Sequence, residues 1–292
     1  MKNSFWFRMK RKITTLLIKN NIVKEAYKQD VAYKYLYKKY FKVINNHKYN
    51  DISNNDTKII WVCWFQGLDN APEIVKVCYE KLTNTFKDYK IILITDQNYS
   101  DYVNIPKYIV DKWKSGLINH THFSDILRVF LLADNGGIWM DSTVYTTAKE
   151  IPSYISENPF FVYKNIKLDR SDEFPIVASS WLIKSNKNNP IMLLTKDLIC
   201  EYWKESNVLI DYYLFHIFFA IASRKYYEMW ENVPTYNNVN PHIMMFELFK
   251  DYDKKRFDFY KSISDFHKLT YKFKDSEITK KTNIYHILRG EK

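Results

Sequence analysis

The stretch Phe123-Ser124-Asp125-Ile126-Leu127-Arg128, followed six residues later by Asn135-Gly136-Gly137-Ile138-Trp139-Met140-Asp141-Ser142-Thr143, decides the fold. It predicts a helix that begins at Ser124 and ends at the glycine pair, because serine is a preferred N-cap and glycine a preferred helix terminator. The apolar residues 138–140 then predict a short buried strand with Asp141 at its carboxyl end. In open α/β sheets ligands bind at that edge.

Three charged side chains in this stretch are candidate catalytic residues. Asp125 and Arg128 are three residues apart and share one face of the predicted helix, so both can point at one polar ligand. Asp141, beside two glycines, can hold a divalent cation or ribose hydroxyls. The alternative is a surface ion pair and an ordinary turn aspartate. Either motif alone is weak, but the two together are much more specific.

The chain around this stretch predicts an α/β fold with a mixed, mainly parallel central sheet. Apolar strands at 58–65 and 91–95 flank a helix through about residue 86, which is the pattern of a βαβ unit. Further strands are expected at 160–163 and 178–183, and residues 144–145 are expected to continue the strand before Asp141. Other helices are expected at 105–117, at 188–203 and from Asp211 onward.

Composition limits the class of protein. The chain has 292 residues, of which 46% are hydrophobic, enough for one large domain with or without an appendage. Its cysteines, Cys63, Cys78 and Cys200, show no C-x-x-C spacing, which argues for a reducing compartment and against disulfides or a zinc site. No apolar run is long enough to span a membrane, and the first residues lack the features of a signal peptide. We therefore expect a cytoplasmic protein.

The excess of positive charge lies in the first 48 residues. They hold 13 Lys and Arg against two acids, so the remaining residues are balanced at 31 of each sign and account for none of the net charge of +11. An apolar stripe at helical spacing (Tyr33, Leu36, Tyr37, Tyr40, Phe41, Ile44) runs among the lysines. This predicts a basic amphipathic helical appendage, residues 1–50, ahead of a catalytic domain, residues 58–292, with the polar stretch 45–57 as the boundary.

Three roles remain open for the appendage. It can bind an anionic membrane surface, it can pack on the catalytic domain with a solvated basic rim, or it can bind nucleic acid. No nucleic-acid fold signature follows it, so nucleic acid is not an expected partner.

The motif S-D-I-L-R, helix, G-G, aromatic, D-x-(D/T) resembles GT-A glycosyltransferases that share a core with the large glucosylating toxins and related mannosyltransferases. It is most similar to bacterial capsular polysaccharide synthesis glycosyltransferases, over roughly residues 58–290. The resemblance implies a GT-A-type nucleotide-sugar-binding domain in which Asp125 and Arg128 hold the donor sugar. Asp141 would be the first aspartate of the D-x-D element, which binds Mn²⁺ or Mg²⁺. Thr143 stands in place of the second aspartate, and a hydroxyl is a far weaker ligand for such cations than a carboxylate.

The resemblance also implies the reaction and its partners. A hexose, galactose or glucose, would move from a UDP-sugar to a hydroxyl of a lipid-linked oligosaccharide, with retention, at the inner face of the plasma membrane. The remaining donor contacts would come from Trp64, Phe65, Gln66, Ser124, Trp139, Ser142 and Lys268. Rival interpretations are a catalytically weak nucleotide-sugar-binding protein and a nucleic-acid-binding protein with a basic arm.

Two of these regions leave structural alternatives open. Trp64 is expected to stack on the nucleotide base and Trp61 to lie in the core, and the alternative is that both tryptophans are core aromatics. Ser180, Trp181 and Asp211 would lie on the acceptor side, but a buried tryptophan and a helix-capping aspartate explain the last two equally well.

Overall fold

A five-stranded sheet forms the centre of the computed structural model, which describes residues 9–10, 12–13, 16, 25–49, 57–166, 175–279 and 281–290. The strand order is β2-β1-β3-β6-β5. The strands are β1 (Ile59–Cys63), β2 (Lys90–Ile94), β3 (Gly137–Met140), β5 (Phe160–Lys164) and β6 (Ala178–Ser185). β1 is parallel to β2 and β3, whereas β6 is antiparallel to both β3 and β5. Four strands thus run in one direction and β6 in the other, which confirms the predicted α/β class with a mixed, mainly parallel sheet.

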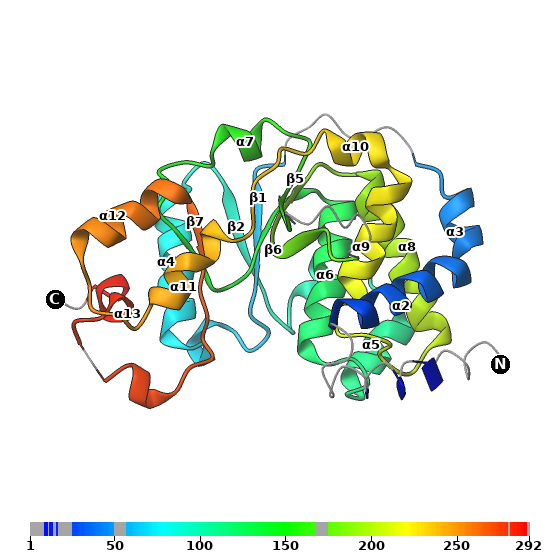
Figure 1. Cartoon of the computed structure of the whole chain (residues 1–292), viewed down its shortest axis with the longest axis horizontal. Helices are drawn as coiled ribbons and strands as arrows, with labels where there is room; N and C mark the ends of the chain where they lie inside the picture. The colour runs from blue at the N-terminus through cyan, green and yellow to red at the C-terminus, as the bar shows by residue number, and fades with distance from the viewer. Residues whose placement is uncertain are drawn as a thin grey trace.

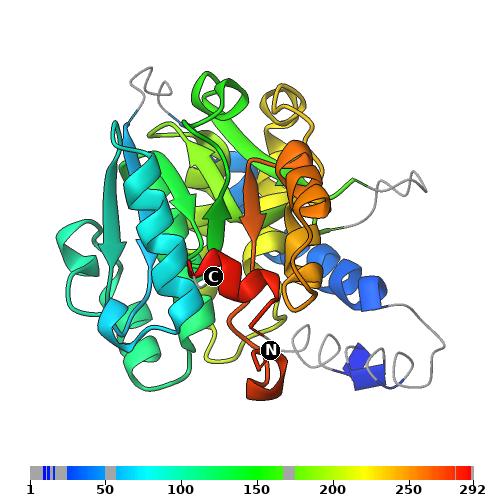
Figure 2. The ribbon, with the colours of Figure 1, turned by 90° about the vertical axis from the view of Figure 1, so that its left-hand side faces the viewer.

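Helices cover both faces of this sheet (Figure 1, Figure 2). One face packs against α6 (His120–Asp134), α8 (Pro190–Glu205) and α9 (Leu214–Lys225), and the other against α4 (Glu73–Thr85). The alternation of side chains along each strand explains the two cores. Trp61 and Trp139 point to the α6 side, while their neighbours Ile60 and Ile138 point to the α4 side.

The shorter elements surround this sandwich. They are α5 (Lys107–Lys114), α7 (Ser153–Ser156), α10 (Tyr227–Glu231), α11 (Ile243–Glu247), α12 (Lys254–Ile263) and α13 (Ile284–Leu288), with 3-10 turns at Leu68–Asn70, Tyr99–Asp101, Asn240–His242 and Asp275–Glu277. Segments after residue 240 pack on α4 and form a third apolar cluster. Among the described residues, no helix has the length and apolar character needed to cross a membrane.

A second, two-stranded sheet corrects one sequence prediction. Residues 144–145 do not continue β3, because β3 ends at Met140 and the chain turns, with the Val144 amide donating to the Asp141 carbonyl at 2.9 Å. The next strand, β4 (Val144–Thr146), pairs instead with β7 (Phe266–Lys268) in antiparallel register. This pairing brings Lys268 beside Val144, close to the end of β3.

The start of α6 is also different from the prediction. Its N-cap is Asn119, whose side chain accepts a hydrogen bond from the His122 amide at 3.0 Å, so the helix begins at His120. Ser124 lies in the second turn and does not cap the helix. The polar first turn, His120-Thr121-His122, carries no apolar periodicity, which is why the sequence pattern placed the helix start too late.

The glycine pair joins α6 to β3 where no other residue fits. Gly136 and Gly137 have φ of 73° and 98°, in the region that favours glycine. A Cβ atom on Gly136 would lie 2.7 Å from the Lys187 amide nitrogen, and one on Gly137 would lie 2.7 Å from the Ile59 carbonyl oxygen. The pair therefore lets α6 reverse directly into the centre of the sheet.

The two N-terminal helices share the main core. Three side chains are buried in the same cluster as α8 and α9: Leu36 of α2 (Glu25–Lys39), Ile44 of α3 (Phe41–Asn46), and Tyr40, which lies between the two helices. Residues 25–46 therefore share a hydrophobic core with the part of the chain that follows the expected boundary at residues 45–57. The first part of the predicted helical appendage, residues 1–24, lies largely outside the described residues.

Candidate active site

Several of the candidate site residues gather at one edge of the central sheet. β1 and β3 end there, and β6, which runs the opposite way, begins there. The Asp141 amide accordingly donates a hydrogen bond to the Trp181 carbonyl at 2.8 Å. Topology thus places the candidate catalytic residue Asp141 beside the candidate acceptor-side residues Ser180 and Trp181, as expected for the carboxyl edge of an α/β sheet.

Arg128 joins the two candidate aspartates. Its Nη1 donates to Asp125 Oδ1, and its Nη2 donates to Asp141 Oδ1 at 3.0 Å. The side chain is only 4% exposed, and its guanidinium lies 4.7 Å from the Trp139 ring centroid and 5.6 Å from that of Phe215. Asp125 and Arg128 are therefore not a surface pair. The buried guanidinium, engaged by both carboxylates, positions the site and does not lie open to a ligand.

Asp141 is held from three directions. Its Oδ1 accepts a second hydrogen bond from Trp139 Nε1 at 2.9 Å, and its Oδ2 lies 3.4 Å from Lys268 Nζ. Lys268 Nζ also donates to Thr143 Oγ1. Trp139 is 1% exposed, so its part in the site is to orient Asp141.

Electrostatics fix the protonation of the site near neutral pH. Burial alone would raise the pKa of Asp125, but the Arg128 charge and a hydrogen bond from His122 lower it overall, so the carboxylate stays charged. Burial lowers the pKa of His216 to about 4, despite the opposing charge of Asp125, so its imidazole is neutral. Near neutral pH the site therefore holds a charged Asp125 carboxylate and a neutral His216 imidazole.

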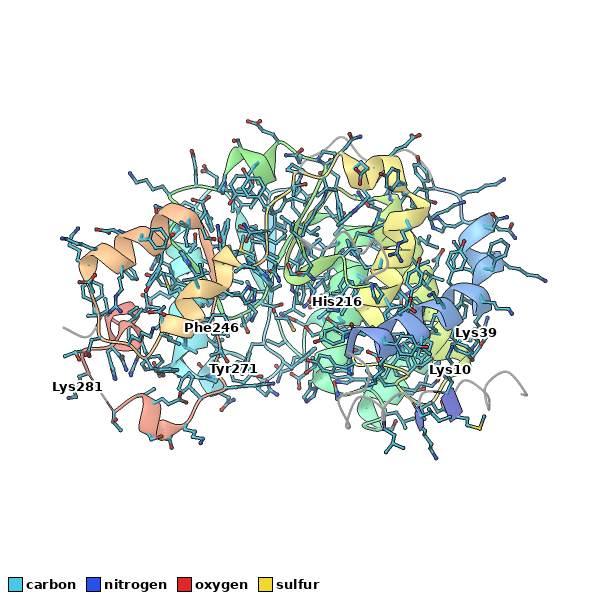
Figure 3. All side chains as sticks on the ribbon, in the orientation of Figure 1. Lys10, Lys39, His216, Phe246, Tyr271 and Lys281 are labelled. Atoms are coloured by element: carbon cyan, nitrogen blue, oxygen red, sulfur yellow. The ribbon has the colours of Figure 1, made fainter. Side chains whose placement is uncertain are left out.

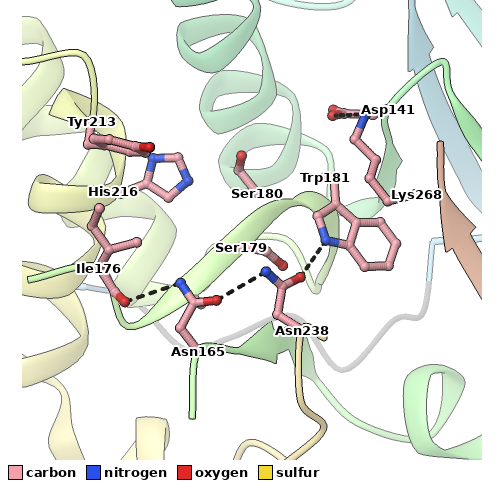
Figure 4. Close-up of a pocket in the computed structure, with 11 residues that line it drawn as sticks. Asp141, Asn165, Ile176, Ser179, Ser180, Trp181, Tyr213, His216, Asn238 and Lys268 are labelled. Carbon is pink, nitrogen blue, oxygen red and sulfur yellow. Dashed lines mark hydrogen bonds and ion pairs between the residues drawn. The ribbon is translucent and has the colours of Figure 1, made fainter. Parts of the chain in front are cut away.

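A pocket of about 380 Å³ opens beside Asp141, a size typical of small-molecule sites (Figure 4). Asp141 and Lys268 line one side, and Tyr213 and His216 line the other. The remaining wall carries a hydrogen-bonded chain in which Trp181 Nε1 donates to Asn238 Oδ1 at 2.7 Å and Asn238 Nδ2 donates to Asn165 Oδ1 at 3.1 Å. Such a wall suits a polyhydroxylated ligand.

Four of these lining residues were missed by the sequence analysis: Asn165, Tyr213, His216 and Asn238. Asn165 directly follows β5, whose carboxyl end lies at the same edge, so the strand-end rule that selected Asp141 could have found it. His216 lies in the first turn of α9, and its Nδ1 atom is buried without a hydrogen-bond partner. Asn238 lies in a loop, and no sequence signal marks it.

The predicted base-stacking segment divides between core and surface. Phe65 is buried and packs against the rings of Trp113 and Phe123, with centroids 5.4 and 5.8 Å away. It therefore belongs to the hydrophobic core next to the carboxyl edge of the sheet. Trp64 is partly exposed and its ring meets Tyr271 edge-on at 5.2 Å, and Gln66 is exposed in the loop after β1. Trp61 lies in the core, as predicted, with 1% of its surface exposed.

The remaining predicted residues lie at the rim or away from the pocket. Ser124 is partly exposed and hydrogen-bonds to Cys63, the last residue of β1, and Ser142 is partly exposed in the turn after β3. Asp211 is 2% exposed and does not line the pocket. It accepts a hydrogen bond from the Tyr213 amide at 3.0 Å, in the turn before α9, which begins at Leu214 and not at Asp211.

The residues expected to bind a divalent cation do not form a ready site for one. In the part of the chain that the structure describes, no group of three or more His, Cys, Asp or Glu side chains is placed to hold a metal ion. Thr143 is 2% exposed, and its hydroxyl and the Asp141 carboxylate both contact Lys268 Nζ. The Mn²⁺ or Mg²⁺ that the resemblance implies remains a prediction.

Comparison with known families places the chain. A family model described as capsular polysaccharide synthesis protein matches residues 12–287. The chain belongs to this family. The family match includes α2 and α3, which agrees with their place in the main core.

Solved structures give only distant similarities. The chain is similar to a structure titled "PaToxG Glycosyltransferase", with 19% identity, a TM-score of 0.38, and coverage of 90% of this chain and 97% of that one. It is also similar to a structure whose title describes a transferase mutant with two cysteine-to-serine substitutions, with 10% identity, a TM-score of 0.38, and coverage of 66% of this chain and 96% of that one. No curated protein matches the chain.

Proposed function

We propose that this member of the capsular polysaccharide synthesis family is a glycosyltransferase that moves a hexose, galactose or glucose, from a UDP-sugar to a hydroxyl of a lipid-linked oligosaccharide. The observation that carries the proposal is the network of Asp125, Arg128 and Asp141 at the carboxyl edge of the sheet, beside a pocket lined in part by amide and hydroxyl side chains. A charged network next to a wall of amides and hydroxyls suits a ligand that combines a diphosphate with a sugar.

The proposed reaction breaks the bond between the sugar's anomeric carbon and the diphosphate oxygen. The electron pair stays on the diphosphate, the acceptor hydroxyl oxygen forms the new bond to the anomeric carbon, and the hydroxyl proton passes to the departing diphosphate. Retention of configuration is part of the proposal, as the resemblance implies. Cationic groups accelerate such a step because they stabilise the charge that develops on the leaving group.

The proposed donor site lies between Trp64 and the pocket. Trp64 would stack on the nucleotide base, and Ser142 and Lys268 would contact the diphosphate. Asp141 would accept hydrogen bonds from hydroxyls of the donor. Arg128 would keep Asp141 in place. Ser180 and the amides of the pocket wall would face the acceptor sugar.

A membrane-surface role for the N-terminal helices completes the proposal. Lys34, Lys38 and Lys42 are exposed on α2 and α3 beside the exposed rings of Tyr37 and Phe41, which are 39% and 50% accessible. Basic residues interleaved with aromatic rings suit an anionic bilayer, and a lipid-linked acceptor would be presented there. We place the protein peripherally at the inner face of the plasma membrane on this basis.

The test is release of UDP from a panel of UDP-sugars, measured with and without a lipid-linked acceptor, for the wild type and Asp141→Asn. We expect turnover of one UDP-hexose in the wild type and a loss of about 100-fold or more in the variant, the scale of removing a key electrostatic group. Asp111→Asn, in an exposed pair on α5, is the matched control and should keep full turnover. Tight binding of UDP-sugar without turnover under any condition would show a binding protein instead.

A further inference from the structure

The ammonium group of Lys268 lies between the two side chains that the D-x-D-like element offers to a cation. Its Nζ is 3.4 Å from Asp141 Oδ2 and donates a hydrogen bond to Thr143 Oγ1. The fold builds this position, because β7 pairs with β4 so that Lys268 lies opposite Val144, the residue after Thr143. The lysine side chain is only 21% exposed.

A divalent cation bound to the same two side chains would take the place of this ammonium group. Mg²⁺ binds oxygen ligands at about 2.0–2.1 Å, so an ion that touches both Asp141 Oδ2 and Thr143 Oγ1 must lie between them. The other carboxylate oxygen, Asp141 Oδ1, already accepts hydrogen bonds from Arg128 and Trp139. Both oxygens of the carboxylate are therefore already engaged by N–H groups, and the ammonium group of Lys268 lies where a metal bound to Oδ2 and Thr143 Oγ1 would have to lie.

The charges at this point are balanced without a metal. Two carboxylates, Asp125 and Asp141, face two cations, Arg128 and Lys268. Arg128 is 4% exposed and is held by both carboxylates, whereas Lys268 lines the pocket. Lys268 is thus the cation of this cluster that can reach a ligand.

We propose that Lys268 supplies to the donor diphosphate the positive charge that a divalent cation would otherwise supply, so that this chain binds its donor without a metal. The inference rests on the proposed function, because a nucleotide-sugar donor is what brings a diphosphate to the pocket. An ammonium group has three N–H donors, so it can keep a contact with Asp141 while it donates to phosphate oxygens. When the anomeric bond breaks, the charge left on the diphosphate develops beside this group.

The decisive measurement is calorimetric binding of UDP to the full chain, in EDTA and in millimolar Mn²⁺. We expect dissociation constants that agree within about twofold between the two conditions. Lys268→Met, which keeps the length of the side chain and removes its charge, should weaken UDP binding roughly tenfold or more, the factor that 1.4 kcal/mol represents. Lys268→Arg should lose less, because it keeps the charge.

Lys254→Met on α12 is the matched control. Lys254 is 79% exposed and pairs with Asp258 on its own helix, so its loss should leave UDP binding unchanged. The comparison of EDTA with Mn²⁺ uses the wild type alone, so it stands even if a variant at position 268 fails to fold.

Two results would overturn the inference, and they differ in what they say of the proposed function. UDP binding that is lost in EDTA and restored by Mn²⁺ would show that a metal displaces Lys268, and the transferase proposal would stand. No binding of UDP in either condition would remove the diphosphate donor itself, and the proposed function would fail together with the inference.

Discussion

At the scale of single residues, the buried charge of Arg128 makes the candidate site sensitive to loss of either aspartate. Asp125→Asn leaves the guanidinium with Asp141 as its one remaining carboxylate in an apolar setting beside Trp139 and Phe215. Breaking a buried ion pair is strongly destabilising, and we expect a loss of about 3 kcal/mol in the free energy of unfolding. Urea denaturation measures it.

An exposed pair provides the control for this variant. Asp111→Asn, which breaks the surface pair with Lys107 on α5, should cost about 0.5 kcal/mol or less. Equal losses in the two variants would contradict the bridging role assigned to Arg128.

His216 predicts how the stability depends on pH. Burial lowers its pKa to about 4 in the folded chain, whereas the unfolded chain binds the proton near the ordinary value of 6.5. The unfolded state therefore holds more protons between pH 4 and pH 6.5, and the contribution of His216 to stability is lost as the pH falls through this window. Three charged groups near the imidazole have smaller effects on its pKa than burial has. Asp125 and Asp141 raise the pKa, and Arg128 lowers it.

Replacement of this histidine tests the assignment. The free energy of unfolding of His216→Gln should fall less between pH 7 and pH 5 than that of the wild type, by urea titration at each pH. If the free energy of unfolding depends on pH as steeply in His216→Gln as in the wild type, the fold does not hold the imidazole neutral.

At the scale of the elements, the junction between α6 and β3 depends on Gly137. A side chain there combines a φ of 98° with a Cβ placed 2.7 Å from the Ile59 carbonyl oxygen in the adjacent strand. We expect Gly137→Ala to lose about 3 kcal/mol of stability, since strained backbone costs about 1–3 kcal/mol and the clash adds to it. Gly116→Ala is matched in φ, at 79°, but meets nothing within 4 Å and should lose about 1 kcal/mol. Chemical denaturation of the two variants side by side decides whether the close approach matters.

Local patterns predicted most of these elements, and long-range pairing accounts for what they missed. The glycine turn, β3 and the position of Asp141 follow from neighbouring residues alone. The contact of Lys268 with Thr143 joins residues 125 positions apart and depends on the pairing of β4 with β7, which no local period encodes. The predicted start of α6 was wrong for a local reason. Asn119 caps a first turn that carries no apolar residue until Phe123, so the apolar pattern does not mark it.

At the scale of the whole molecule, residues 25–46 of the basic N-terminal segment are both part of the fold and a candidate membrane surface. One side of α2 and α3 buries Leu36, Tyr40 and Ile44 in the main core, and the other exposes lysines and aromatic rings (Figure 3 labels Lys39 on this segment). Deleting the segment would therefore expose the apolar side chains of α8 and α9 that pack against α3 and α2. Membrane binding has to be tested with substitutions on the exposed side.

The double variant Tyr37→Ser with Phe41→Ser tests that side directly. Both rings are exposed and contact each other at 6.0 Å between centroids, so their loss should leave the free energy of unfolding nearly unchanged. It should weaken binding to phosphatidylserine-containing vesicles by roughly tenfold, because the apolar area that enters the interface disappears while the lysines remain. Cosedimentation with anionic and with neutral vesicles at two salt concentrations separates the contribution of the aromatic rings from that of the lysine charges, because salt screens only the charges.

Tyr227→Ser on α10 is the matched control, because Tyr227 is 60% exposed but lies outside the basic segment. This variant should bind vesicles as tightly as the wild type does. Wild-type chain that ignores anionic vesicles at low salt would remove the membrane-surface role and leave α2 and α3 as packing helices with a solvated basic rim. Retention that survives the double variant but disappears at high salt would assign binding to the lysines alone. In that case the aromatic rings beside them would have no part in reaching a lipid-linked acceptor.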